Sequence, residues 1–221
     1  MNAIVFMILF VVISSVPSAL ARWIATEGSS DRIRKLLAGG MIAVSLLYNI
    51  YYFSPPIFRV AESLPLQVCD LLGFVAALAL STRWRPARAT LVLSAIPFIS
   101  QAVLTPVGDQ QALSLRTWLY WTFHGYIFAC FMFELLVARF KPRVRDLGWL
   151  FVVDFGYVAL IGMLDVRFGW NYGYIGHIKP AAATLVDLLG PWPARTFSML
   201  ALAMLLQTIC FFMFKKRRPR T

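Results

Sequence analysis

The 221-residue chain is too apolar to be a soluble domain, since hydrophobic residues make up 60% of it and only 14% are charged. This composition, with a mean hydropathy of +0.71, is typical of membrane-embedded helices. A net charge of +11 would suggest nucleic-acid binding in a soluble protein. Here the basic residues gather in short segments between apolar runs, so we expect no nucleic-acid partner.

Seven apolar runs of roughly 20 residues are long enough to cross the hydrocarbon core as helices. They predict membrane spans at residues 3–21, 36–53, 64–82, 89–107, 117–138, 147–166 and 194–214. The connections are too short for a separate soluble domain. The sequence therefore predicts an all-α fold, with a single seven-helix transmembrane domain over residues 1–221.

The first run also resembles a signal peptide, because Ala19-Leu20-Ala21 fits a signal-peptidase site. The segment before it carries no Lys or Arg, which is unusual for a signal peptide. Cleavage would also reverse the sidedness of every later loop. We therefore expect residues 3–21 to remain as a span.

The distribution of basic residues predicts the orientation of the bundle. Four basic residues follow the first span, three the third, four the fifth and five the last, which leaves five of the 21 for the other side. The positive-inside rule then places the N-terminus outside and the C-terminus in the cytoplasm of a multi-pass protein of the cell membrane. The basic clusters, including the tail 215–221, are expected to contact anionic headgroups at the cytoplasmic face.

The third predicted span opens with polar side chains, reading Leu-Pro-Leu-Gln-Val-Cys-Asp-Leu over residues 64–71. Polar and ionisable groups inside a membrane are costly, and they usually face a bundle interior or a cavity. At the rise of an α-helix, Cys69 lies ~8 Å below the outer end of this span. The alternative is that Cys69 is a small packing residue, because Gly73 and Ala76 continue the same helix face.

A histidine in the fifth span lies at a similar depth. His124 is ~10 Å below the outer surface, within ~3 Å of the depth of Cys69. Tyr120, Trp121 and Phe128 flank it on the same side of the helix. A thiol close to an imidazole can act as an activated nucleophile. A hydrogen-bonded structural histidine is the other interpretation.

Further polar residues are candidates for substrate binding near the outer end of the bundle. Gln101 either lines a cavity or bonds a carbonyl freed by Pro97. The connection over about 171–192 predicts a re-entrant or interfacial helix above the opening, although a rigid aromatic loop remains the alternative. The candidate substrate-binding residues are Asn49, Gln67, Asp70, Gln101, Asn171, Lys179 and Asp187.

Nearer the cytoplasmic side, Asp154 and Gln207 each lie about seven residues from the inner end of their span. They predict either a structural hydrogen-bonded pair or a second functional site. The three cysteines of the chain lie at different depths, so we expect no structural disulfide. The pattern suggests neither a metal site nor another cofactor.

Several motifs together resemble a known family. They are residues 64–71, the His124-Gly125 step, Asn171-Tyr172-Gly173-Tyr174, Lys179-Pro180 and the stretch 184–193, which ends in Gly-Pro-Trp-Pro. These resemble the bacterial YwaF-type integral membrane family, which is similar to TMEM-type cysteine acyltransferases and, more distantly, to androgen-induced membrane lipid hydrolases. The family's first motif often reads Leu-Pro-Leu-His-Leu-Cys, and Gln67 stands here at its histidine.

The resemblance implies Cys69 as nucleophile, His124 as base and a bacterial inner membrane as location. The expected function is that of an intramembrane acyltransferase or lipid-ester hydrolase acting on membrane lipids, with a phospholipid as the expected substrate. The alternative is a non-enzymatic membrane protein that binds or transports a small solute or lipid through the same outer polar pocket. A retinal-type photoreceptor is disfavoured, because the last span contains no lysine for a Schiff base.

The orientation is testable with reporter fusions or cysteine accessibility in intact cells. Because the basic residues are so unevenly divided, residues 139–145 and the tail should be cytoplasmic, and residues 167–193 should be accessible from outside. Finding residues 139–145 outside would overturn both the topology and the depths assigned to Cys69 and His124.

Overall fold

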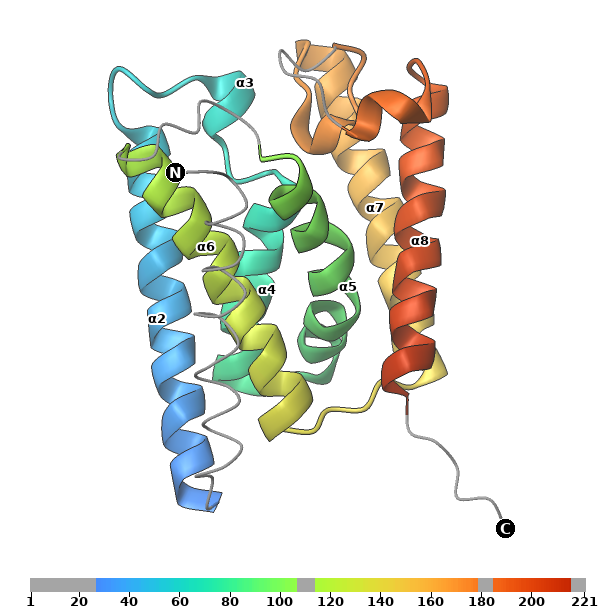
Figure 1. Cartoon of the computed structure of the whole chain (residues 1–221). Helices are drawn as coiled ribbons and strands as arrows, with labels where there is room; N and C mark the ends of the chain where they lie inside the picture. The colour runs from blue at the N-terminus through green and yellow to red at the C-terminus, as the bar shows by residue number, and fades with distance from the viewer. Residues whose placement is uncertain (1–26, 107–113, 179–184, 216–221) are drawn as a thin grey trace.

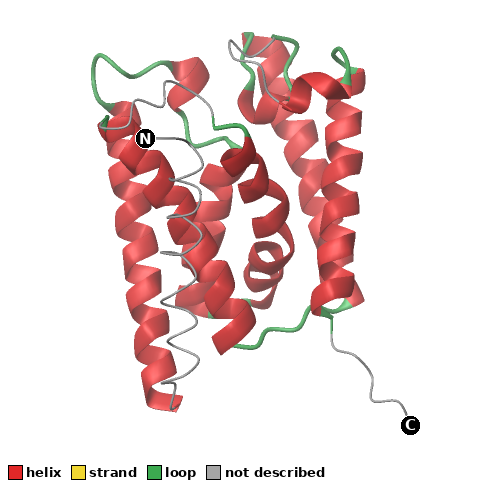
Figure 2. Cartoon of the chain, viewed as in Figure 1, coloured by secondary structure: helices red, strands yellow, loops and turns green. Residues whose placement is uncertain are grey.

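In the computed structural model, the described residues, 27–106, 114–178 and 185–215, form helices joined by loops, and they contain no strand (Figures 1 and 2). The expected span at 3–21 lies outside these residues. The helices are α2 (Glu27–Phe53), α3 (Val60–Ser63), α4 (Val68–Thr82), α5 (Arg85–Leu104), α6 (Leu115–Met132), α7 (Val144–Phe168) and α8 (Ala194–Phe214). A π-helical turn, Phe133–Val137, continues α6, and two 3-10 turns cover Tyr172–Tyr174 and Leu185–Leu189.

Five helical segments among the described residues are long and apolar enough to cross a membrane. They are Ser29–Phe53, Arg85–Leu104, Leu115–Val137, Val144–Phe168 and Ala194–Phe214. Helix α4 is also apolar, but it has only 15 residues. The prediction of a helical membrane bundle is therefore confirmed, while the count of seven spans and their orientation stay predictions. We call the end of the bundle that holds residues 169–178 and 185–193 the predicted outer end.

Helix α4 begins four residues later than the sequence pattern suggests. Leu64 and Gln67 both have extended backbone conformations, and Val68 is the first helical residue. Leu64 precedes Pro65, and a residue before proline is disfavoured in the helical region. The start of the 64–71 motif is therefore a non-helical segment, extended at Leu64 and Gln67 with a turn between them, and Cys69 lies in the first turn of the helix that follows.

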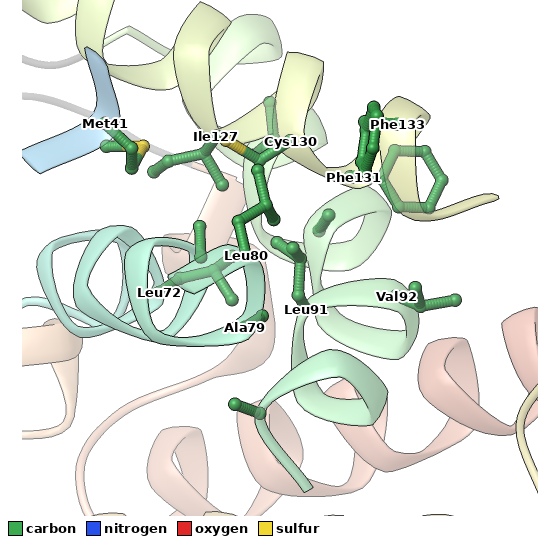
Figure 3. Close-up of a cluster of buried hydrophobic side chains, with 14 of the residues drawn as sticks. Met41, Leu72, Ala79, Leu80, Leu91, Val92, Ile127, Cys130, Phe131 and Phe133 are labelled. Atoms are coloured by element: carbon green, nitrogen blue, oxygen red, sulfur yellow. The ribbon is translucent and has the colours of Figure 1, made fainter. Parts of the chain in front are cut away.

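The helices form two groups that share α5. Helices α2, α4 and α6 pack against one another and, through α4 and α6, against α5, whereas α7 and α8 pack against each other and α5 (Figure 1). The larger core lies in the first group, and its buried side chains come from α2, α4, α5 and α6 and the turn after α6. Figure 3 labels Met41, Leu72, Ala79, Leu80, Leu91, Val92, Ile127, Cys130, Phe131 and Phe133 from this core.

Ion pairs join the helices at the opposite, basic end. Arg88 on α5 bonds Glu134 in the π-helical turn at 2.7 Å, and only 1% of the Glu134 side chain is exposed. Arg85 pairs with Asp146 in the first turn of α7 at 2.6 Å. Breaking a buried pair leaves an uncompensated charge, so the Arg88–Glu134 contact holds the end of α6 against α5.

Gly73 allows α4 and α6 to approach closely, as the small residues on this helix face predict. A Cβ atom at Gly73 would lie 2.6 Å from Cζ of Phe123 and 3.4 Å from Cε of Met41. Phe123 is 1% exposed and stacks on Tyr48 with ring centroids 4.5 Å apart, so its ring has little room to move. The α4–α6 contact therefore depends on the absence of a side chain at Gly73.

We predict that Gly73→Ala destabilises the protein by about 1–3 kcal/mol, the usual cost of overpacking a core. The matched control is Gly156→Ala, because a Cβ at Gly156 meets nothing within 4 Å. This control should be neutral or slightly stabilising, since alanine favours helix over glycine. Thermal unfolding in detergent would measure both changes. Equal Tm values for Gly73→Ala and the parent would contradict the close contact.

Candidate functional site at the predicted outer end

Two motifs that are far apart in the sequence meet at the predicted outer end. The Oε1 atom of Gln67 accepts a 2.8 Å hydrogen bond from the Gly173 backbone N–H. The hydroxyl of Tyr157 on α7 donates to the Leu66 carbonyl at 2.9 Å. These bonds hold the non-helical segment before α4 against α7 and the turn Tyr172–Tyr174.

Tyr172 bonds the same segment at residues nearer its N-terminal end. Its hydroxyl accepts from the Leu64 N–H at 3.0 Å and donates to the Val60 carbonyl. Its own backbone N–H donates to the buried carboxylate of Asp165 at 3.0 Å. Backbone groups removed from water need such partners. The tyrosine therefore satisfies the polar backbone on both sides of the junction.

Gly173 is required at this junction for two reasons. Its φ of +61° lies in the left-handed region, which residues other than glycine rarely adopt. A Cβ there would also lie 2.4 Å from the Tyr157 hydroxyl oxygen. The Asn-Tyr-Gly-Tyr motif thus contributes a backbone shape as well as side chains.

Cys69 is the second residue of α4, half-buried beside the buried Asp70. The Asp70 carboxylate accepts a hydrogen bond from the Gln67 N–H at 3.3 Å. The first N–H groups of a helix have no partner within the helix, and the helix dipole favours negative charge there. Burial and the neighbouring Asp70 carboxylate, however, both disfavour a thiolate at Cys69, so the thiol needs a base to lose its proton.

Tyr174 lies close to this cysteine. Burial, and to a smaller degree the neighbouring Cys69 and Tyr52, raises the pKa of the Tyr174 phenol to about 12. The phenol is therefore neutral at physiological pH, where it can act as a hydrogen-bond donor. It adds a polar group from the Asn-Tyr-Gly-Tyr motif to the surroundings of the thiol.

His124 on α6 is 4% exposed, and its tautomer follows from its contact. Its Nδ1 atom lies 2.8 Å from the Tyr120 carbonyl oxygen. Because a carbonyl can only accept, Nδ1 carries the proton and the lone pair is on Nε2. The Tyr120 ring lies 4.3 Å from the imidazole between centroids, and its hydroxyl donates to Ala102 on α5.

Cys69 and His124 lie on helices that touch. Gly73, one turn after Cys69, packs against Phe123, the neighbour of His124. The contact places both residues in the same half of the bundle. The structure shows no hydrogen bond between the thiol and the imidazole, whose Nδ1 is bonded to Tyr120, and their catalytic pairing stays a prediction.

Three of the predicted substrate-binding residues bond within their own segments. The Asn49 amide donates to the Ser45 carbonyl at 2.8 Å, the Gln101 amide donates to the Thr105 hydroxyl at 2.5 Å, and the Asn171 side chain accepts from the Gly176 N–H at 3.0 Å. Asp187 is exposed in the turn Leu185–Leu189. Lys179 and residues 180–184 lie outside the described residues. Gln67 and Asp70 lie next to Cys69 at the start of α4. Gln101 instead bonds Thr105, one turn further along α5.

A cavity of about 130 Å³ lies between the two helix groups. Residues of α4, α5, α7 and α8 line it, and Gly173 and Ile175 cover its outer side. Most of the lining is apolar, with Thr90, Ser94 and Asp154 as polar members. Val68, the neighbour of Cys69, belongs to the lining, but Cys69, His124 and Gln101 do not.

The Asp154 and Gln207 side chains influence each other across α7 and α8, but the predicted direct hydrogen bond between them is not formed. The Gln207 Nε2 donates instead to the Ser94 hydroxyl on α5 at 3.5 Å. The second carboxylate oxygen of Asp154, Oδ2, has no hydrogen-bond partner. The Gln207–Ser94 contact therefore joins α8 to α5, and Asp154 contributes a polar wall to the cavity.

Tyr157 is the residue of this site that sequence reasoning missed. It is a tyrosine inside an apolar span with no motif around it, and only the folded chain shows that it reaches Leu66. Tyr174 could have been found from the sequence, because it belongs to the Asn-Tyr-Gly-Tyr motif. Among the described residues, no group of three or more His, Cys, Asp or Glu side chains is placed to hold a metal ion.

The apolar helices and the polar junction at one end define a multi-pass helical membrane protein. The model of the TMEM164 family matches residues 1–214, and the chain belongs to this family. No curated protein and no solved structure matches the chain.

The junction can be tested by changing Gln67. Gln67→Leu should increase amide hydrogen exchange in residues 172–176, because it leaves the Gly173 N–H without its acceptor. Gln67→Glu is the matched control, since it keeps a side-chain oxygen at that place and should preserve most of the protection. Exchange that is unchanged in Gln67→Leu would contradict the role assigned to this bond.

Proposed function

We propose that the protein is an intramembrane acyltransferase or lipid-ester hydrolase in which Cys69 is the nucleophile and His124 the base. The observation that carries the proposal is the position of Cys69, in the first turn of α4, where two distant motifs meet. The resemblance to the YwaF-type family and to TMEM-type cysteine acyltransferases supports the same assignment.

The chemistry proceeds in two balanced steps. Nε2 of His124 accepts the thiol proton, and the Cys69 thiolate attacks the carbonyl carbon of an ester. The carbonyl oxygen becomes an oxyanion, which the N–H groups at the start of α4 stabilise. The ester C–O bond then breaks, the leaving alkoxide takes the proton from the imidazolium, and the acyl group remains on Cys69 as a thioester.

The second step releases the acyl group. The hydroxyl of a lipid acceptor, or water, gives a proton to His124 and attacks the thioester carbonyl. The C–S bond breaks, and the imidazolium returns its proton to the thiolate. An acyltransferase uses the lipid hydroxyl and a hydrolase uses water. A phospholipid in a bacterial inner membrane suits this site, because its ester groups lie just below the headgroups, as Cys69 does in the predicted orientation.

The alternative is a protein that binds or carries a lipid or small solute without chemistry. One observation favours it: the lining of the cavity between α4, α5, α7 and α8 includes neither Cys69 nor His124. A cavity of that kind can hold a ligand that never reaches the thiol.

The proposal predicts that Cys69→Ala abolishes acyl transfer and lipid-ester hydrolysis with little change in thermal stability, because a small apolar group replaces the thiol. His124→Ala should lower the rate strongly as well. In the Cys69→Ala background its effect should largely vanish, because residues that act as a unit are not additive. Purified protein incubated with isotope-labelled phospholipid, followed by mass spectrometry of the lipids, measures these rates.

Cys130→Ala and Cys210→Ala are the controls, because Cys130 lies more than one turn beyond His124 on α6 and Cys210 belongs to the small core with Leu93, Leu150 and Phe211. They should keep their activity. Full activity in Cys69→Ala would reject the enzymatic proposal in favour of the binding protein.

A further inference from the structure

A groove of about 530 Å³ runs between α7 and α8 at the predicted outer end. Its walls are mainly apolar, with Gly162, Met163 and Phe197 among them, and Arg167 lies at its rim. Arg167 is exposed and is near the end of α7. Its guanidinium lies over the ring of its neighbour Phe168, 5.6 Å from the centroid.

The groove adjoins the cavity behind it. Val158 on α7 and Ile175 in the loop line both hollows. On α8, Thr196 lines the groove, whereas Leu200 and Ala203 line the cavity. These three residues are spaced four and three apart and therefore lie on one face of the helix. The two hollows therefore follow one another along α8, with Val158 and Ile175 as the wall between them.

The cavity reaches the turn of α4 that carries the proposed nucleophile. The cavity lining on α4 runs from Val68 to Val75, about 10 Å at the rise of a helix. Val68 is the residue next to Cys69. Towards the basic end, the polar side chains of Ser94, Gln207 and Asp154 bound the cavity. The apolar space therefore begins at the helix turn that carries Cys69, whose side chain is not part of the lining, and it stops at a polar wall.

The combination of surfaces identifies the class of ligand. Apolar walls do not bind a free phosphate. An exposed guanidinium does not bind a neutral hydrocarbon. Arginine binds phosphate oxygens with two parallel hydrogen bonds, and apolar side chains suit an acyl chain. A phospholipid carries both groups in one molecule, with the phosphate at the level of the helix end.

We propose that the groove and the cavity form one phospholipid-binding site, in which Arg167 contacts the phosphate and one acyl chain passes between Val158 and Ile175 into the cavity. The site extends the proposed function, because the lipid it holds is the substrate whose ester reaches Cys69. Binding is separable from chemistry, since none of these contacts needs the thiol.

The test uses the full chain in the Cys69→Ala background, where acyl transfer cannot occur. The probe is phosphatidylcholine with a diazirine midway along one acyl chain, in phosphatidylcholine vesicles. After irradiation, peptide mapping should find labelled side chains in residues 199–203. Ala203→Phe should reduce this labelling at least about fivefold, because it fills the cavity. Ala201→Phe, which adds the same volume on an exposed face of α8, should leave the labelling unchanged.

A second substitution protects the test against misfolding. If Ala203→Phe lowers the Tm strongly, Leu200→Trp blocks the same path and should give the same loss of labelling. Labelling that is equal in the blocked variant and its parent would overturn the proposal, because it would come from lipids surrounding the bundle.

The phosphate contact has its own control. Arg167→Gln should reduce the fraction of protein that retains phospholipid in native mass spectrometry about threefold, the scale of an exposed charge pair. Arg59→Gln removes an exposed arginine at the same end, where it is paired with Glu62 at 3.8 Å, and should have no effect. Equal retention in Arg167→Gln and Arg59→Gln would overturn the role of Arg167.

The outcomes separate the two proposals. Cavity labelling in a protein whose Cys69 form transfers no acyl group would reject the enzymatic function and keep the lipid site. Acyl transfer that depends on Cys69, without cavity labelling, would reject the lipid site alone.

Discussion

The arrangement depends on satisfying the polar backbone of the non-helical segment before α4. Residues 64–67 of this segment are not helical and are partly buried, so their N–H and carbonyl groups need partners other than those of a helix. Tyr172 supplies partners for Leu64 and Val60, and Tyr157 supplies one for Leu66. These bonds determine where α4 begins, and they thereby place Cys69 in the first turn of that helix.

The same bonds connect the two helix groups. Away from the predicted outer end, α7 and α8 reach the rest of the bundle mainly through α5, by the Arg85–Asp146 pair and the small core of Leu93, Leu150, Cys210 and Phe211. Between these attachments the groups do not close on each other, and the cavity fills the space. The bundle is therefore fastened at its two ends, with the cavity between its halves.

Gln67 shows how a change in a motif can keep a structural role. The corresponding YwaF-type motif often has histidine at this place, whereas here an amide oxygen accepts the Gly173 N–H. A neutral imidazole also has one nitrogen that can accept a hydrogen bond. The position therefore makes sense as an anchor for the loop, and the proposed chemistry does not need a titrating group there. The imidazole that the mechanism uses is that of His124, whose tautomer follows from the Tyr120 carbonyl.

The sequence by itself determined the membrane class, the positions of the apolar helices within the described residues and the motifs that form the polar junction. Hydropathy over 20 residues and helical rise carry this information, and the equal depths of Asp154 and Gln207 followed from the same rise. Only the tertiary structure decided which helix faces meet, because periodicity along one helix does not specify its neighbour. For that reason the reach of Tyr157 to Leu66, the pairing of Gln101 with Thr105 and the hollow from Arg167 towards Val68 could not be predicted.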